Sequence, residues 1–412
     1  MSRGKRGNLR NGTGPPIGIM SEKSSKIHVW VPDLFSTIGG IQAFSRYLIE
    51  ALYEEIGSDK IRVLVKNDVS GSEHLENGFR NIDALGHWPL VLRTPRFAIE
   101  SLRQAYRERP GLIVSTHLNF GPVAQFIRRC LGIRYVLVAH GIDAWYLKDG
   151  SRRKALQQAD LVLAVSRYTR DRLVQEIGID ANRIKIFPNT FAPDMFSIGF
   201  KSPQLLNKHG LSPQTPVILT VCRLAEADRY KGYDQIIKAM PRILSEVPNA
   251  RYLIVGKGPD RPRIEKLIAE VGVQDAVTLV GFVPDEELAD YYNLCDLFAM
   301  PSKAEGFGIV YLEALACGKP VLAGNKDGSR DALADGELGV LVDPDDVGEI
   351  AREVIQVITH QHSHPCIYQP ELLRKRVIEL FGFSTFKHTL TRYLSDWVSI
   401  KPNQTSSNYM DR

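Results

Sequence analysis

The chain contains 412 residues, carries a formal net charge of +5 at pH 7 and is 44% hydrophobic. This length exceeds what one hydrophobic core usually organises, so we expect about two or three domains. Four of the positive charges lie near the N-terminus, at Arg3, Lys5, Arg6 and Arg10. Because the rest of the chain is almost neutral, the composition argues against a strongly basic nucleic-acid-binding protein.

Cysteine usage and hydropathy indicate a protein of a reducing compartment. The five cysteines are odd in number and widely spaced, at positions 130, 222, 295, 317 and 366. This pattern does not suggest a disulfide framework, so we expect a cytoplasmic protein. No apolar run approaches the ~18 residues of a membrane span, and residues 1–24 are predicted to be an extension outside the fold, either disordered or artificial.

The first half of the chain has the pattern of a parallel β-sheet flanked by helices. Short apolar runs alternate with segments of helical periodicity, at Ile27–Val31, Ile61–Val65, Leu112–Ser115, Arg134–Ala139 and Leu161–Val165. Such runs are typical of strands that are buried on both faces. We therefore predict an α/β domain over residues 25–190, followed by a linker over residues 191–215.

A second alternation of the same kind predicts a second α/β domain over residues 216–383. Its expected strands are Val217–Val221, Tyr252–Val255, Val277–Val280, Leu297–Met300, Pro320–Ala323 and Gly339–Val342. In doubly wound sheets, ligands bind beyond the carboxyl ends of the strands. Four residues fall just past predicted strand ends and are expected to converge on one site: Arg223, Gly256, Val283 and Glu305.

The segment from Lys303 to Glu313 is the most informative motif in the chain. Glu305 precedes a loop that contains Gly306 and Gly308, and Glu313 lies in a predicted helix eight residues after Glu305. Glycines allow the backbone to approach a ligand closely, and the N-terminus of a helix attracts anions such as phosphate. The two carboxylates suit neutral hydroxyl groups on either side of that phosphate, a sugar on one side and a ribose on the other.

This E-x7-E arrangement resembles the signature of glycosyltransferase family 4, whose members are retaining enzymes. Further segments match that family in order and spacing: Gly39-Gly40, His140-Gly141, Val221-Cys222-Arg223-Leu224, Lys231-Gly232, Val255-Gly256-Lys257-Gly258-Pro259 and Gly281-Phe282-Val283. The resemblance covers roughly residues 27–350 and implies the GT-B fold, in which two Rossmann-like domains face each other across a cleft. It also implies that residues 384–412, with a helix from Ser384 to about Ile400, pack back onto the first domain.

The resemblance implies four catalytic residues and no obligatory metal: His140, Arg223, Lys231 and Glu305. Arg223 and Lys231 would stabilise the departing diphosphate, and Arg229 is a rival to Lys231 because the intervening loop is longer than the commonest family pattern. Glu305 would hold hydroxyls of the donor sugar, and His140 would face that sugar. The alternatives are surface charges for the cations, a helix-start carboxylate for Glu305 and an interior histidine for His140.

The substrate-binding residues that the resemblance implies are Gly39, Gly40, Arg223, Lys231, Lys257, Val283, Glu305, Gly306, Phe307, Gly308, Ile309 and Glu313. Glu313 would bind ribose hydroxyls, and the backbone N–H groups of residues 307–309 would hold sugar and phosphate oxygens. Gly39 and Gly40 would let the first helix approach the phosphates. Lys257 and Val283 would lie near the base. The alternatives are an exposed helix acid for Glu313 and a simple turn for the two N-terminal glycines.

Two further patterns have the form of metal sites, but we assign a metal to neither. Asp343-Pro344-Asp345 has the D-x-D form, yet Asp345 is expected to cap a helix that begins near Asp346. A polar connector that lacks helical spacing contains His360, His362, His364 and Cys366. We therefore predict no metal and no other obligatory cofactor.

The resemblance predicts a retaining hexosyltransferase of exopolysaccharide or cell-envelope glycan synthesis. The predicted donor is UDP-glucose, with GDP-mannose as the alternative, and the predicted acceptor is a hydroxyl of a glycan or lipid-linked saccharide. A sugar-nucleotide epimerase, a glycogen synthase-like enzyme and a non-catalytic binding module stay open. A nicotinamide-dependent dehydrogenase is disfavoured, because Gly256-Lys257-Gly258 lacks the third glycine of the fingerprint, at Arg261.

A basic segment from Arg93 to Arg109 leads to a prediction about membranes. Arg103 and Arg107 lie four residues apart on a predicted helix. Members of the resembled family often contact anionic lipid through such helices of the first domain. The segment predicts either peripheral contact with the inner face of the plasma membrane or a solvated helix face. Nucleic acid is not an expected partner.

Overall fold

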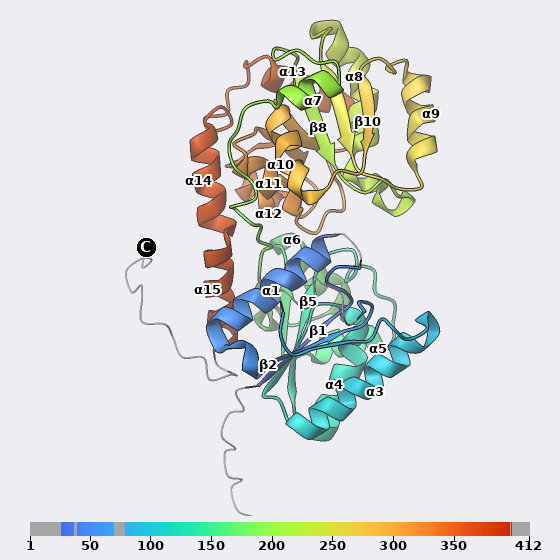
Figure 1. Ribbon diagram of the computed structural model, residues 1–412, viewed down its shortest axis with the longest axis vertical. Helices are drawn as coiled ribbons and strands as arrows, with labels where there is room; N and C mark the ends of the chain where they lie inside the picture. The colour runs from blue at the N-terminus through green and yellow to red at the C-terminus, as the bar shows by residue number, and fades with distance from the viewer. Residues whose placement is uncertain (1–25, 37–38, 70–78, 396, 398–412) are drawn as a thin grey trace, which may run out of the picture.

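The computed structural model describes residues 26–36, 39–69, 79–395 and 397. These residues form two lobes, each built around a parallel β-sheet with helices packed on it (Figure 1). The predicted extension over residues 1–24 and the end of the predicted C-terminal helix lie outside the described residues. The two-lobed α/β architecture that the sequence predicted is confirmed.

The first sheet has seven parallel strands in the order β3-β2-β1-β4-β5-β6-β7. They are β1 (Ile27–Val31), β2 (Ile61–Val65), β3 (Ile82–Ala84), β4 (Leu112–Ser115), β5 (Arg134–Ala139), β6 (Leu161–Ala164) and β7 (Ile184–Ile186). The predicted strands are confirmed because their apolar runs are buried on both faces. The sequence did not predict β3 and β7, which are short edge strands with partly exposed side chains.

The helices of the first lobe follow the strands in alternation. They are α1 (Gly40–Ile56), α3 (Leu90–Glu108), α4 (Gly121–Leu131), α5 (Ser151–Gln158) and α6 (Arg167–Arg172). On α1, Phe44, Leu48 and Leu52 recur every four residues and are buried, so this helix presents one apolar stripe to the core.

The second sheet has six parallel strands in the order β10-β9-β8-β11-β12-β13. They are β8 (Val217–Val221), β9 (Arg251–Val255), β10 (Val277–Gly281), β11 (Leu297–Met300), β12 (Val321–Gly324) and β13 (Val340–Val342). All six are predicted strands, with ends that differ from the prediction by at most one residue. The helices of this lobe are α7 (Pro203–Lys208), α8 (Tyr233–Glu246), α9 (Arg261–Val271), α10 (Asp285–Leu294), α11 (Ile309–Ala316), α12 (Ser329–Ala332) and α13 (Val347–Ile358).

Two segments connect the lobes. The chain crosses once after β7 and returns through α14 (Pro370–Phe381) and α15 (Phe383–Leu394), which run along the side of the molecule (Figure 1). α14 packs against α11, and α15 packs against α1. The Arg374 guanidinium donates to the carbonyl oxygens of Ala316 at 2.7 Å and Pro193 at 3.0 Å, which ties the first crossing to the second. The domain boundaries at residues 190 and 216 stay a prediction.

Within the described residues, no helix combines the length and the hydropathy that crossing a lipid bilayer requires.

Candidate active site

The carboxyl ends of the two sheets meet at the junction of the lobes. The turn at His140 and Gly141 follows β5, and the loop that contains Gly306 follows β11. A Cβ atom on Gly306 would lie 1.8 Å from the carbonyl oxygen of His140, and one on Gly141 would lie 2.7 Å from the Cα atom of Gly306. The backbones of the two lobes therefore touch here, and only glycine fits either position.

Lys231 and Glu305 form an ion pair beside this contact. Lys231 Nζ donates to Glu305 Oε2 at 2.5 Å, and each side chain is only 15% exposed. Desolvation opposes the charge on Lys231, but the Glu305 carboxylate outweighs it and raises the pKa of Lys231. The ring of Tyr230 lies 5.2 Å from Nζ and adds a cation–π contact. Lys231 is thus a permanently charged, fixed cation of the kind that a developing phosphate charge requires.

Asp327 holds the loop that carries Glu305, a role that the sequence did not reveal. Its carboxylate is fully buried and accepts hydrogen bonds from Glu305 N at 2.6 Å, Ser302 Oγ at 2.7 Å and Ser329 N at 2.9 Å. Desolvation raises the pKa of Asp327 to about 6, although these bonds favour the carboxylate. Three bonds to one carboxyl group fix the loop, so Glu305 stays beside Lys231.

Arg223 follows β8 and is 69% exposed. Its Nη2 donates to the buried carboxylate of Asp228 at 3.1 Å, which orients the guanidinium. An arginine has five N–H donors, so one bond to Asp228 leaves most of them for a phosphate.

Arg229, the predicted rival of Lys231, is engaged away from Glu305. Its Nη2 and Nε donate to the carboxylate of Asp260 at 2.6 and 3.0 Å, and Arg263 binds the same carboxylate at 2.8 Å. The Arg229 side chain is 40% exposed. The geometry therefore favours Lys231 over Arg229 as the second phosphate-binding cation.

Glu313 lies on α11, where the Tyr292 hydroxyl donates to its Oε2 at 2.7 Å. The side chain is only partly exposed, and desolvation raises its pKa to about 7 although the bond from Tyr292 favours the carboxylate. This environment does not match an ordinary exposed helix acid. Once ionised, Glu313 accepts hydrogen bonds from ligand hydroxyls.

The raised pKa of Glu313 predicts a pH dependence of stability. The pKa of Glu313 is about 7 in the native protein and 4.5 in its ordinary state. Between these two pH values the native Glu313 carboxyl therefore keeps a proton that the unfolded chain releases. The stabilisation of the native state by this bound proton is fully present below about pH 4.5 and is lost as the pH rises through 7. We expect Glu313→Gln to reduce the fall in unfolding free energy between pH 5 and 8 by about 1–2 kcal/mol, with allowance for partial exposure. Urea denaturation measures this, and an equal fall in both proteins would contradict it.

The N-termini of α1 and α11 lie opposite each other. A Cβ atom on Gly40, the first residue of α1, would be 3.9 Å from the Cδ1 atom of Ile309, the first residue of α11. Gly39 is the N-cap of α1, and Gly308 precedes α11 with a φ of 90°, which favours glycine. The first N–H groups of a helix lack partners within it and attract anions. Two such positive ends therefore face the position predicted for the diphosphate.

His140 is neutral at physiological pH. Its Nε2 donates to the carbonyl oxygen of Thr116 at 3.0 Å, which leaves Nδ1 as an acceptor, and its backbone N–H donates to the Asp143 carboxylate at 3.0 Å. Desolvation lowers the pKa of the imidazole to about 3. The edge of the Phe44 ring packs against it, with the ring centroids 4.8 Å apart. His140 can accept a hydrogen bond from a sugar hydroxyl but does not supply a positive charge.

Two predicted binding residues do not offer their side chains to a ligand. Phe307 is 1% exposed, and its ring packs edge-on against Phe381 at a centroid distance of 5.4 Å. Val283 is 7% exposed and belongs to the core. The exposed Lys257 lies over the half-exposed ring of Phe282, with Nζ 4.5 Å from the centroid. Phe282, which the sequence interpretation missed, therefore presents an exposed aromatic ring beside Lys257, whereas Val283 does not.

Asp345 does not cap α13, and this prediction was wrong by one residue. Asp346 is the N-cap, and its carboxylate accepts a hydrogen bond from Glu349 N at 2.9 Å. Asp345 instead pairs with Lys303 and Lys326, each at 3.0 Å. The two lysine ammonium groups thus form ion pairs with the Asp345 carboxylate, which would have to be a ligand in a D-x-D metal site.

The histidine-rich connector is engaged in separate contacts. His362 Nε2 lies 3.2 Å from a Glu353 carboxylate oxygen, and His364 Nε2 donates to the Gly336 carbonyl oxygen at 2.7 Å. The ring of His360 packs on Tyr368. Within the part of the chain that the structure describes, no three potential ligands are grouped as a metal ion requires.

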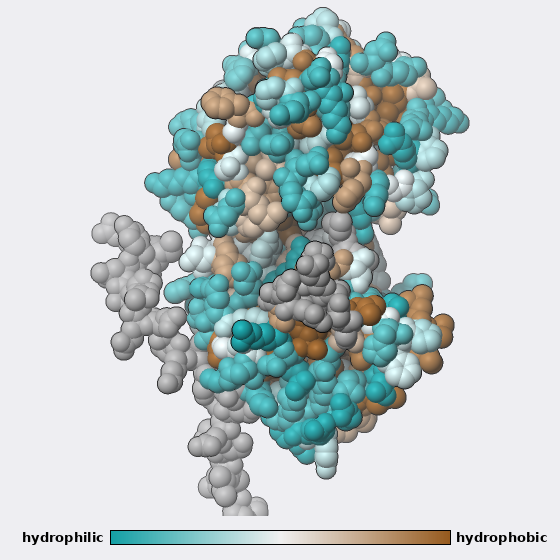
Figure 2. All heavy atoms as spheres, viewed as in Figure 1, coloured by the Kyte–Doolittle hydropathy of each residue, from teal (hydrophilic) through white to brown (hydrophobic). Residues whose placement is uncertain are grey.

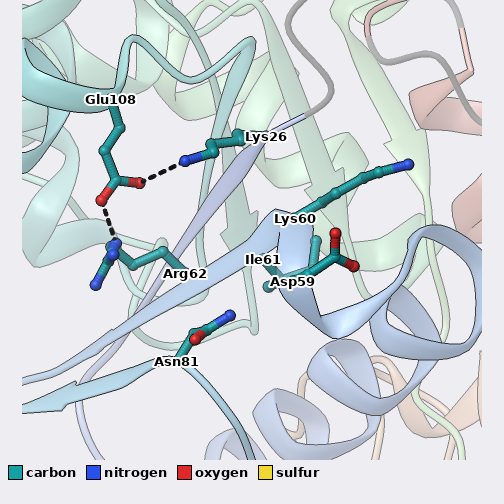
Figure 3. A pocket seen from close by; sticks show the side chains of 7 residues that line it. All are labelled: Lys26, Asp59, Lys60, Ile61, Arg62, Asn81 and Glu108. Atoms are coloured by element: carbon teal, nitrogen blue, oxygen red, sulfur yellow. Dashed lines mark ion pairs between the residues drawn. The ribbon is translucent and has the colours of Figure 1, made fainter.

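A hollow of about 110 Å³ lies at the opposite end of the first sheet (Figure 3). It is lined by Lys26, Asp59, Lys60, Ile61, Arg62, Asn81 and Glu108. Glu108 pairs with Arg62 at 2.7 Å and with Lys26 at 3.9 Å (Figure 3). Because ligand sites of such sheets lie at the carboxyl ends of the strands and this hollow lies at the amino ends, we do not assign it to the active site.

The fold and the site together define a class of protein. Two facing parallel sheets form the GT-B architecture, and the cations, carboxylates and helix N-termini at their junction suit a nucleotide sugar. Two family models match the chain, "Glycosyl transferases group 1" over residues 202–371 and "Glycosyltransferase Family 4" over residues 38–194. The chain belongs to the group 1, family 4 glycosyltransferases, as its motifs predicted.

Named relatives include two mannosyltransferases. The chain is 34% identical over 249 residues to the GDP-mannose-dependent alpha-(1-6)-phosphatidylinositol monomannoside mannosyltransferase of Mycolicibacterium smegmatis, a match that covers 57% of this chain and 62% of the relative. It is 27% identical over 353 residues to a GDP-mannose-dependent monoacylated alpha-(1-6)-phosphatidylinositol monomannoside mannosyltransferase of Corynebacterium glutamicum, which covers 81% of this chain and 89% of the relative. The match thus spans less than two thirds of the length of the relative from Mycolicibacterium smegmatis.

A solved structure of HepE from Anabaena in complex with UDP superposes with a TM-score of 0.74. The match covers 90% of this chain and all of that one, at 21% identity. At this identity the likeness establishes the shared fold alone.

Proposed function

We propose that this protein transfers a hexose from a nucleotide diphosphate sugar to an acceptor hydroxyl, with retention of the anomeric configuration. The observation that carries the proposal is the partly buried ion pair of Lys231 and Glu305 at the junction of two opposed sheets. Arg223 and the N-termini of α1 and α11 add positive charge there. Retention follows from membership of a retaining family.

The charges at the junction suggest how each residue acts. Breaking the anomeric C–O bond leaves negative charge on the diphosphate, which Lys231, Arg223 and the helix N-termini stabilise. Glu305 and Glu313 accept hydrogen bonds from hydroxyls of the hexose and the ribose. Because Lys231 holds Glu305, that carboxylate acts in binding rather than as a nucleophile. Neutral His140 accepts a hydrogen bond from the donor sugar.

The donor in this proposal is GDP-mannose, the alternative that the sequence left open, rather than UDP-glucose. Both mannosyltransferase relatives are named as GDP-mannose-dependent. The preference for UDP-glucose rested on no residue that reads the base, and the likeness to the UDP complex of HepE supports the fold only.

The acceptor in this proposal is a hydroxyl of a mannosylated inositol lipid. The relatives from Mycolicibacterium smegmatis and Corynebacterium glutamicum are named for phosphatidylinositol monomannoside acceptors. This choice narrows the predicted class of glycan or lipid-linked saccharide.

A donor panel tests the proposed activity. The purified protein is incubated with phosphatidylinositol monomannoside and either GDP-mannose or UDP-glucose, and the product is analysed by NMR. We expect α-linked mannose from GDP-mannose and at least about tenfold slower transfer from UDP-glucose. A β-linked product would reject retention. Epimerised donor or acceptor-free polymer would favour the alternative enzymes, and binding without turnover would favour the binding module.

We also propose that the start of α3 contacts an anionic membrane. Leu90 and Val91 are 74% and 82% exposed, and Arg93 and Arg96 follow them on the same helix. Figure 2 shows hydrophobic side chains at the edge of the lower lobe, on the side where Figure 1 places α3. Arg103, which the sequence singled out, donates to Glu100 at 3.0 Å, and Arg96 pairs with the same carboxylate at 4.0 Å. Exposed apolar side chains next to cations suit an anionic lipid surface.

Sedimentation with vesicles tests this contact. We expect the wild-type protein to sediment with phosphatidylglycerol-containing vesicles at low salt, and the Leu90→Ser/Val91→Ser variant to lose most of that binding. Phe200→Ser is the matched control, because Phe200 is 99% exposed in the segment after the first crossing. Equal sedimentation of the double variant and the wild type would reject the proposed surface.

A further inference from the structure

A second contact between the lobes lies where α6 and α12 face each other at the junction (Figure 1). Arg167 is the first residue of α6 in the first lobe, whereas Asp331 and Asp335 belong to the second lobe. Arg167 Nε donates to Asp331 Oδ1 at 2.6 Å, and Arg167 Nη2 lies 2.7 Å from Asp335 Oδ2. We call these two ion pairs the interlobe latch.

The two ion pairs of the latch differ in their surroundings. The Asp331 side chain is only 11% exposed, whereas Arg167 and Asp335 are 45% and 43% exposed. Asp335 has a second cation within its own lobe, since Arg330 pairs with it at 3.1 Å. Asp331 pairs with Arg167, and the backbone N–H of Tyr168 donates to it at 3.5 Å. Partly buried charges are screened less than exposed ones, so the pair with Asp331 is the stronger half of the latch.

On the second lobe, the latch is attached to the loop that carries Glu305. Asp331 lies on α12, whose first residue is Ser329. Ser329 N donates to Asp327 at 2.9 Å, and the same carboxylate accepts the hydrogen bond from Glu305 N. Gly328 N also donates to the carbonyl oxygen of Glu305 at 2.9 Å. α12 and the Glu305 loop therefore form one hydrogen-bonded unit.

On the first lobe, the latch is attached to the turn that carries His140. The ring of Tyr168, next to Arg167, packs edge-on against Trp145 with the centroids 5.3 Å apart. Trp145 lies beside Gly141, because a Cβ atom on that glycine would be 3.3 Å from Cζ2 of the indole. Close-packed groups shift together rather than independently. The position of Arg167 is therefore coupled to the position of the His140 turn.

We propose that Arg167 is a positioning residue, which holds the Glu305 loop against the His140 turn by pairing with Asp331 and Asp335 and so keeps the lobes closed around the donor. In this account Arg167 does not contact the reacting atoms. The closure of the lobes rests on the contacts alone. The effect on transfer rests on the proposed function.

Small-angle X-ray scattering of the full chain without ligand tests closure. Arg167→Met removes the charge and keeps a long side chain. Arg170→Met is the matched control, because Arg170 lies on the same helix and pairs with Asp171 of its own lobe at 2.7 Å. We expect the radius of gyration to rise by about 0.5–1 Å in Arg167→Met, as a hinge opening would produce, and to stay unchanged in the control. Equal radii of gyration for Arg167→Met and the wild type would overturn the latch.

Steady-state kinetics separate positioning from a merely stabilising role. We expect Arg167→Met to lower kcat about five- to tenfold, because the reacting groups are no longer aligned. The KM for GDP-mannose should change by less than about twofold, since Arg223, Lys231 and Glu313 all belong to the second lobe. Arg167→Lys keeps a charge and should recover part of the lost kcat. A lower melting temperature with unchanged kcat would show a structural ion pair only and would overturn the proposal.

A double-mutant cycle tests whether Arg167 acts through Asp331. We expect Asp331→Asn to lower kcat about as much as Arg167→Met does, and the double variant to lose no more than either single variant. Losses that multiply in the double variant would overturn the assigned partner.

The salt dependence of transfer tests the electrostatic nature of the latch. We expect the ratio of wild-type kcat to Arg167→Met kcat to fall toward one as NaCl rises from about 0.05 to about 0.5 M, because salt screens the partly exposed pairs. A constant ratio would overturn an electrostatic latch. A wild-type protein that transfers no hexose, with a radius of gyration that still rises in Arg167→Met, would contradict the proposed function while supporting the latch.

Discussion

Replacing Lys231 with Ala is expected to lower kcat by about 10²–10³-fold, the cost of losing a cation that stabilises charge in the transition state. Lys231 is 15% exposed and its Nζ atom lies 2.5 Å from Glu305, so water would not fully replace the lost ammonium group. Among the described residues, no second lysine contacts the Glu305 carboxylate. Steady-state transfer from GDP-mannose to the lipid acceptor measures the effect. Activity within about threefold of wild type would contradict the role assigned to Lys231.

Two controls separate charge loss from structural damage. Arg229→Ala removes a neighbouring cation that is bound to Asp260, and Arg263 still compensates that carboxylate. We expect this variant to keep nearly full activity. Lys231→Ala also leaves Glu305 without a partner, which destabilises a partly buried carboxylate. The double variant Lys231→Met/Glu305→Gln removes both charges, and it should regain stability without regaining kcat.

Replacing Gly306 with Ala is expected to lower kcat/KM at least about 100-fold. The added Cβ would lie 1.8 Å from the carbonyl oxygen of His140, a backbone atom that cannot rotate away. The clash lies between the lobes, so the lobes separate while each core stays packed. A displacement of about 1 Å between reacting groups is enough to cost this much. The same transfer assay with the same lipid acceptor measures the loss.

The matched control for the Gly306 variant is Gly348→Ala. There the Cβ atom would meet only the side chains of Asp346 and Arg242, at 3.2 and 3.6 Å. We expect wild-type activity for Gly348→Ala and similar melting temperatures for both variants. Wild-type kcat/KM in Gly306→Ala would show that closure of the lobes in this arrangement is not needed for transfer.

The fold was predictable because strands buried on both faces leave continuous apolar runs in the sequence. The runs at Ile27–Val31 and Val217–Val221 became β1 and β8 without a shift. β3 and β7 carry no such signal, because each is only three residues long and has a charged residue at its centre, Asp83 or Lys185. For that reason these two strands were missed.

The candidate site was predictable only in part, because the remaining contacts are formed between distant segments. The motif gave Glu305 and Glu313, but nothing near them in the sequence indicates that Asp327 fixes the loop or that Tyr292 binds Glu313. A register shift between Leu279 and Gly281 at the end of β10 also breaks the strict alternation of side chains. Beyond this shift Phe282 is half-exposed, whereas the predicted neighbour of the base, Val283, is buried.

Arg229 and Lys231 are a second example of a feature that depends on contacts between distant segments. The two residues are only two positions apart in the sequence. Their spacing from Arg223 does not indicate which of them reaches the site. Their partners in the structure differ, since Asp260 holds Arg229 and Glu305 holds Lys231, and on this difference we propose Lys231. Such a choice depends on packing between β-sheet loops, which a local pattern does not encode.

A crystal structure of the protein with GDP-mannose tests the central claim most directly. We expect the diphosphate to bind between Arg223 and Lys231 at the N-termini of α1 and α11, and the ribose hydroxyls to bind Glu313. The mannose should lie beside Glu305. Well-ordered nucleotide elsewhere, away from residues 305–313, would contradict the account.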